Sequence, residues 1–216
     1  MPQIRVSGYT VSVDGYGAGP VQTLQQPMGR RGELLHGWMR ETATFQKMMG
    51  KSGGSQGIDE EFAAAAMENL GAWIMGRNMF GPVRGPWPDD EWKGWWGSEP
   101  PYHCPVFVLT HHARPDLAME GGTVFHFVTG GLDEAVRRAR EAAGERDIRI
   151  GGGASTVRQC LERGYIDTMH VAVSPVLVGE GEPLFAGLDL PTLGYRIARR
   201  VEGEKAMHLV IDKSPP

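Results

Sequence analysis

The chain has little cysteine, no run of basic residues and no long apolar segment. Its 216 residues include two cysteines, Cys104 and Cys160, so thiols alone can form neither a CxxC redox pair nor a four-ligand zinc site. The formal net charge of -4 argues against a nucleic-acid partner, because domains that bind nucleic acid usually present a basic face. No segment is apolar over the length of a bilayer, and the N-terminus has no apolar signal core. We therefore expect a cytoplasmic protein with no membrane partner.

The histidines also give little support for a metal site. His111 and His112 are neighbours, and neighbouring side chains of a strand point to opposite faces, so at most one of them is expected to face a given site. Cys160 falls on the apolar stripe of an expected helix and is interpreted as a small core residue. No bound metal is expected.

What the chain does contain is an alternation of strands and helices. Short apolar segments predict strands at residues 3–9, 72–76, 105–110, 123–128, 147–151, 167–178, 194–202 and 206–212. Helical spacing predicts helices at 58–70 and 133–143. This alternation favours a mainly parallel sheet covered on both faces, and Gly203 favours a hairpin of the last two strands. We expect a single α/β domain over residues 1–216.

The glycine run Gly151-Gly152-Gly153, followed by Ala154-Ser155-Thr156, is the most informative motif. It lies between the strand at 147–151 and an amphipathic helix that ends near Gly164. Glycines let the backbone approach a ligand closely, and the first free N–H groups of a helix attract an anion. A nucleotide pyrophosphate is the expected anion. The alternative is a plain strand-to-helix turn in which Thr156 is the N-cap and Gln159 completes a capping box.

A Rossmann fold is disfavoured. Its fingerprint needs a third spaced glycine where this chain has Thr156, and an acidic residue about twenty positions later, where it has Val171.

Two further strand ends carry groups suited to phosphate. The strand at 72–76 runs into Gly76-Arg77-Asn78, in which the guanidinium offers a rigid fork of donors. The strand at 105–110 ends in Thr110-His111, with Arg114 shortly after. Ligands of open α/β sheets bind at the carboxyl ends of strands, so these segments are expected to meet the glycine run in one site.

The order of these three segments resembles the dihydrofolate reductase fold. Within that fold, the stretches at 11–16 (VSVDGY) and 173–185 (VSPVLVGEGEPLF) resemble the reductase domain at the C-terminus of bacterial riboflavin-biosynthesis deaminase-reductases and its stand-alone relatives. The resemblance spans nearly the whole chain and implies a three-layer α/β fold, NADPH as cofactor and a homodimer. The zinc motif of the deaminase is missing, so a stand-alone reductase is expected.

The resemblance also implies the site residues. Arg77, Thr110, His111 and Arg114 could gather around the 2′-phosphate of NADPH. Dihydrofolate reductases bind the pterin through an acid on the helix before the Gly-Arg strand. The matching positions are Asp59 and Glu60, although acids in a first helical turn are also favoured by the dipole alone. Asp14 matches a motif near the nicotinamide, and Asp-Gly is equally a turn dipeptide.

Two insertions interrupt the pattern, at about 17–57 and 81–104. The first contains helical spacing from Leu34 to Met49, interpreted either as packing on the domain or as a wall of the substrate pocket; Trp38 and, on the next helix, Phe62 are the candidate substrate contacts. The second holds four tryptophans, which could form a lid, a dimer contact or an aromatic wall, or could simply anchor the loop.

Together these features favour an NADPH-dependent reductase of a small heterocycle such as a pterin or an aminouracil. The alternatives are a nucleotide-binding module or dimeric sensor without turnover, and true folate reduction.

Overall fold

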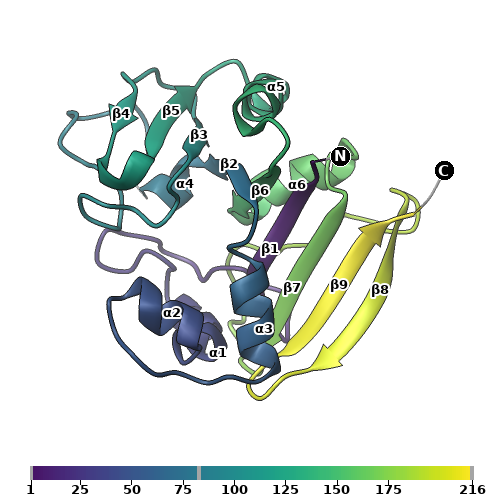
Figure 1. The fold of residues 1–216 in the computed structure, drawn as a ribbon. Coiled ribbons are helices and arrows are strands. Elements are labelled where there is room, and N and C mark those ends of the chain that lie inside the picture. Colours follow the sequence, from purple (N-terminus) through teal and green to yellow (C-terminus); the bar gives the residue numbers. More distant parts are fainter. Residues whose placement is uncertain (1, 82–83, 215–216) are drawn as a thin grey trace.

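A computed structural model describes residues 2–81 and 84–214, and these residues build one sheet (Figure 1). The strands pair in the order β4-β5-β3-β2-β6-β1-β7-β9-β8. The central pairings β3–β5, β2–β3, β2–β6, β1–β6 and β1–β7 are parallel, whereas β4–β5, β7–β9 and β8–β9 are antiparallel. The strands are β1 Ile4–Ser12, β2 Leu70–Gly76, β3 Pro105–Leu109, β4 Leu117–Ala118, β5 Val124–Val128, β6 Asp147–Gly152, β7 Thr168–Ser174, β8 Tyr195–Glu202 and β9 Met207–Lys213.

Helices cover both faces of the sheet, as the expected three-layer α/β fold requires. On β6, Ile148 and Ile150 pack with α5 (Leu132–Ala143) and α6 (Ala154–Glu162) in the main core. Arg149 points to the other face, because side chains alternate along a strand. That face carries α1 (Gly37–Arg40), α2 (Ala43–Met48) and α3 (Ile58–Ala65), whose labels lie near one another in the lower part of Figure 1. The mainly parallel sheet and the C-terminal β8–β9 hairpin are therefore confirmed.

Several boundaries differ from those expected. The strand at 167–178 ends at Ser174 because Pro175 follows, and proline cannot donate a ladder hydrogen bond. The helix at 58–70 ends at Ala65, and the two-residue strand β4 was too short to be predicted. None of the described helices is both long enough and apolar enough to cross a membrane.

The helical spacing from Leu34 to Met49 forms three short pieces rather than one helix. A 3-10 turn, η1 (Gly32–His36), leads into α1, and Thr42 then separates α1 from α2. Thr42 has an extended backbone, and its hydroxyl accepts a hydrogen bond from the Phe45 amide while donating to the Met39 carbonyl. A threonine that caps a new helix in this way ends the preceding one, although the apolar spacing continues.

Candidate functional site

A cavity of about 880 Å³ runs along the carboxyl ends of the parallel strands. Two groups of residues line it. The glycine end comprises Gly76, Arg77, Asn78, Thr110, His111 and residues 151–156, and the helical end comprises Thr10, Trp38, Met39, Arg40, Phe45, Ala63, Ala66, Trp73 and Arg149. The three strand-to-loop crossings that the sequence singled out therefore meet in one place.

The glycine run ends in an uncapped helix N-terminus. Gly153 is the N-cap of α6, with no side-chain cap, and the first helical hydrogen bond runs from the Val157 amide to the Gly153 carbonyl. The capping box with Thr156 as N-cap is therefore wrong, and Gln159 donates instead to Ser155. Because no side chain caps the helix, its first N–H groups face the cavity and can accept an anion.

Gly76 lies against the same helix. A Cβ atom on Gly76 would stand 2.7 Å from the Thr156 hydroxyl oxygen, which is closer than real Cβ contacts allow. The φ of Gly76 is -74°, so glycine is needed here for space and not for backbone conformation. This close approach joins the end of β2 to the start of α6.

Arg77 brings an incompletely bonded cation to the glycine end. Its guanidinium carbon lies 3.6 Å from the centre of the Trp87 ring, and Nη1 donates to the Gly85 carbonyl. Nε and Nη2 are buried and have no acceptor among residues 2–81 and 84–214. Burial, with Arg84 and Arg114 nearby, lowers the pKa of Arg77. Two free donors and a destabilised charge are what an incoming phosphate would satisfy.

The other polar groups of the glycine end are partly engaged. The Thr110 hydroxyl accepts from the His112 amide, and Asn78 Nδ2 donates weakly to Gln22 over 3.4 Å. Asn78 Oδ1 is buried and has no hydrogen-bond partner in the described part of the chain. Both His111 and His112 line the cavity, contrary to expectation, because β3 ends at Leu109 and the strand alternation stops there.

Arg114 does not reach the cavity, so its assignment to the 2′-phosphate is corrected. Its side chain is buried, its Nη2 donates to the carbonyls of Asp90 and Trp92, and its Nε lies 3.2 Å from the Asp90 carboxylate. The guanidinium also lies within 5.1 Å of the ring centres of Trp87 and Phe127. Arg114 thus holds the tryptophan-rich insertion.

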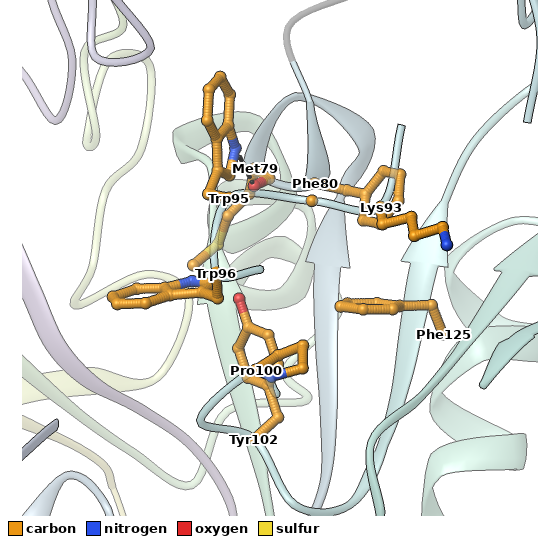
Figure 2. Close-up of a pocket in the computed structure, with 9 residues that line it drawn as sticks. Met79, Phe80, Lys93, Trp95, Trp96, Pro100, Tyr102 and Phe125 are labelled. Atoms are coloured by element: carbon orange, nitrogen blue, oxygen red, sulfur yellow. Dashed lines mark hydrogen bonds between the residues drawn. The ribbon is translucent and has the colours of Figure 1, made fainter. Parts of the chain in front are cut away.

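The tryptophans of that insertion mostly anchor it. Indole N–H groups of Trp87, Trp92 and Trp95 donate to the carbonyls of His112, Phe80 and Met79. Figure 2 shows Trp95 reaching Met79, with Trp96 beside it. Trp95 and Trp96 also line the cavity, so the insertion contributes an aromatic wall as well.

The three acids expected to be catalytic lie outside the cavity lining. The exposed carboxylate of Asp14 accepts hydrogen bonds from the amides of Val178 and Gly179. The Ser12 hydroxyl, followed by these two amides, lowers the pKa of Asp14 to about 2. Asp14 is therefore a turn residue that ties β1 to the 175–185 loop.

Asp59 and Glu60 are used within the α1–α3 layer. Asp59 is buried, accepting from His208 Nε2 at 2.8 Å and from the Lys205 amide at 3.0 Å. Glu60 accepts from the amide and hydroxyl of Thr44. Helical position placed both acids correctly on α3, but only tertiary contacts show that Asp59 points to β9 and Glu60 to α2.

Of the two candidate substrate contacts, one lines the cavity. Trp38 is buried there, and its indole donates to the Thr10 hydroxyl at 3.0 Å. Phe62 lies away from the cavity and stacks on His170 and His208, with both ring-centre distances 4.3 Å. The α3 turn directs the neighbouring Ala63, instead of Phe62, toward the cavity.

The sequence analysis missed many of the cavity residues, among them the titratable residues Tyr9, His36, Arg149 and Glu182. Burial, followed by the charge of Glu182, raises the pKa of Tyr9, and burial lowers the pKa of His36 to about 4. Arg149 stands out in the sequence as a charge between the two buried isoleucines of a central strand, and that signal could have marked it.

Comparison with known proteins agrees with this architecture. A putative riboflavin biosynthesis protein from Shewanella sp. PV-4 covers 100% of both chains at 20% identity, with a TM-score of 0.59. RibD from Acinetobacter baumannii is 15% identical over 99% of this chain and 58% of its own, with a TM-score of 0.53. These likenesses show the fold.

A sequence relative matches over part of its length. The uncharacterized protein YyaP of Bacillus subtilis (strain 168) is 34% identical over 59 residues, which are 27% of this chain and 31% of that protein. The match therefore spans about a third of that relative. The model of the RibD C-terminal domain, in contrast, matches residues 5–209. The chain belongs to the RibD C-terminal domain family.

Proposed function

We propose that the protein is an NADPH-dependent reductase of a small heterocyclic substrate. The observation that carries the proposal is the glycine end of the cavity, which is lined both by the uncapped N-terminus of α6 and by Arg77. The family supports a reductase, and the helical end of the cavity, walled by Trp38 and Trp73, suits a flat ring.

The residues present fit NADPH. Gly151, Gly152 and Gly153 leave room for a pyrophosphate against the helix dipole, and Arg77 offers a charged fork for a 2′-phosphate. When bound, the cofactor would supply a hydride to an electron-poor double bond. The chain would orient the two rings and exclude water.

The proton that accompanies the hydride needs another source than Asp14, Asp59 or Glu60. Among the described residues that line the cavity, Glu182 is the one with a carboxyl group, and we assign it this role. A pterin held by the acid on α3 is no longer supported, because Asp59 is bound to His208. An aminouracil-type ring remains compatible with the cavity.

The cofactor assignment is tested by Arg77→Ala. We expect this change to weaken NADPH by roughly 1–3 kcal/mol while NADH is much less affected, since the lost donors would meet the additional phosphate. Isothermal titration calorimetry with both coenzymes measures this difference. Arg137→Ala is the matched control, because Arg137 is an exposed arginine of α5 paired with Glu141. Equal weakening of both coenzymes would show that Arg77 does not meet the 2′-phosphate.

A module that binds coenzyme without turnover predicts a different outcome. It would bind NADPH normally and oxidise none of it when a panel of aminouracils, pterins and folates is supplied. If any compound of the panel causes the nicotinamide absorbance of NADPH to fall, the result supports the proposed reductase function. Turnover that is confined to dihydrofolate would support folate reduction instead.

A further inference from the structure

The lining of the cavity is strongly cationic although the chain is acidic overall. Among the described lining residues, one carries a carboxylate, Glu182, and four are arginines: Arg40, Arg77, Arg84 and Arg149. Arg77 and Arg84 lie on the segment that follows β2, where the cofactor phosphates are proposed. Arg149 belongs to the helical end, on the sheet face that carries α3.

Arg149 is a cation without an acidic partner. In the described part of the chain, no carboxylate lies within 4.0 Å of its guanidinium, whereas the adjacent Arg5 pairs with Asp147 at 3.5 Å. Nη1 donates to the Ala66 carbonyl at 2.9 Å and to the Met67 sulfur at 3.3 Å, and Nη2 donates to the Ser7 carbonyl at 2.6 Å. Nε is buried and finds no acceptor among the residues that the structure describes.

The position of Arg149 is fixed from two sides. Its guanidinium carbon lies 4.3 Å from the centre of the Trp73 ring, and its Nη1 is held by the carbonyl of Ala66, the C-cap of α3. Burial lowers the pKa of Arg149 to about 9, so its charge is destabilised where it stands. A rigid, under-satisfied cation at the wall of a cavity is a binding group for an anion.

We infer that the substrate is a planar aromatic molecule that carries a small monoanionic group, such as a ring carboxylate, and that Arg149 binds this group. The inference rests on the proposed function, because it assigns the substrate half of the same cavity. Trp73 would stack beside the ring that bears the anion. A dianionic phosphate fits less well, since the carbonyl oxygens of Ser7 and Ala66 already surround the guanidinium and would repel it.

Benzoate, the isosteric neutral benzamide and inorganic phosphate are suitable probes. Each is titrated into the full chain, with and without saturating NADPH, and binding is followed by calorimetry and tryptophan fluorescence. We expect benzoate to bind at least about tenfold more tightly than benzamide, because only benzoate forms a charge-assisted bond. Inorganic phosphate is expected to compete poorly with benzoate. Equal binding of benzoate and benzamide, binding of neither, or tighter binding of phosphate would overturn the inference.

Two variants locate the interaction. Arg149→Met keeps the length of the side chain and should abolish the preference for benzoate over benzamide. Arg5→Met is the matched control, because Arg5 lies on the same face of the sheet and does not line the cavity. Its side chain donates to the carbonyls of Ala65, the last residue of α3, and of Glu68, which follows the helix. Preference that persists in Arg149→Met would contradict the inference. If Arg149→Met fails to fold, the affinities of the unmodified protein for benzoate, benzamide and phosphate still test the inference.

The same titrations separate this inference from the proposed function. If NADPH binds and benzoate does not, the proposed reductase function stands and the proposed role of Arg149 is wrong. If benzoate binds and NADPH does not, the anion site at Arg149 stands and the proposed reductase function is wrong.

Discussion

The Asp59 carboxylate and the His208 imidazole form a buried hydrogen bond, with Oδ1 and Nε2 2.8 Å apart. The bond continues into the sheet: His208 Nδ1 lies 2.9 Å from His170 Nε2, and His170 Nδ1 accepts from the Gly8 amide at 3.1 Å. Since the Gly8 amide is a donor, neutral His170 carries its proton on Nε2 and donates to His208, which in turn donates to Asp59. This chain of hydrogen bonds supports β1 at Gly8, where its register with β7 shifts.

Asp59→Asn should lower the free energy of unfolding and leave NADPH binding intact. The amide has one acceptor where the carboxylate offers two, so either His208 or the Lys205 amide loses its partner, at a cost of about 1–3 kcal/mol. Urea unfolding measures the change, and Glu61→Gln, exposed on the same helix, is the control. Unchanged stability with lost turnover would instead make Asp59 catalytic.

Stability should fall as the pH drops below neutral. Burial lowers the pKa of His170 to about 3 and that of His36 to about 4, from 6.5. Below about pH 6.5 the unfolded chain binds protons that the folded chain does not, so the stability present above that pH is lost progressively toward pH 4. Each group contributes a slope of up to about 1.4 kcal/mol per pH unit in that window.

The slope is measured by urea unfolding between pH 7 and pH 4.5. His170→Gln should make it shallower, whereas His111→Gln should not, because the His111 imidazole is exposed. The same slope in His170→Gln and the unmodified chain would show that His170 titrates normally.

Gly76→Ala should destabilise the protein by crowding Thr156. The added methyl group would stand 2.7 Å from the Thr156 hydroxyl oxygen, and such overpacking costs about 1–3 kcal/mol. Thr156→Ala removes that oxygen, so the double variant should recover much of the stability. Additive losses in the double variant would contradict a direct contact. Thermal unfolding of the unmodified protein, the two single variants and the double variant measures this double-mutant cycle.

Arg114→Met should loosen the tryptophan-rich insertion without changing coenzyme preference. The variant loses the hydrogen bonds to Asp90 and Trp92, so proteolysis within residues 84–100 should become faster. The ratio of NADPH to NADH affinity should stay constant. A selective loss of NADPH affinity would restore Arg114 to the cofactor site.

Glu182→Gln should slow turnover while NADPH binds as before. The amide cannot deliver the proton that the hydride requires, and loss of a positioned acid typically costs about 10²–10⁴-fold in rate. Glu180→Gln is the control, since Glu180 is exposed and pairs with Arg30 outside the cavity lining. Equal rates in both variants would assign the proton to water or to another group.

Most of the fold could be predicted from local patterns. Apolar segments located every strand except β4, and the glycine run located the start of α6 to within a few residues. Residues 34–49 were harder, because the apolar spacing continues through Thr42 while its hydroxyl starts a new helix. Whether a threonine caps a helix or sits within it depends on neighbours that the local pattern does not contain.

The site divides in the same way. Gly76, Arg77 and Gly151 to Thr156 were predicted together because the carboxyl ends of parallel strands meet at one edge, whatever the details of packing. The acids were not predictable, since a helical position specifies where Asp59 stands but not which of several neighbours it faces.

The sequence by itself determined the α/β order, the strand ends and the glycine turn, because these follow from periodicity and backbone sterics over a few residues. Only the tertiary structure decided that Arg114 and Asp59 serve packing while Arg149 faces the cavity. The reason is physical: a charged side chain takes its role from the partners that desolvate or neutralise it, and those partners come from residues distant in the chain.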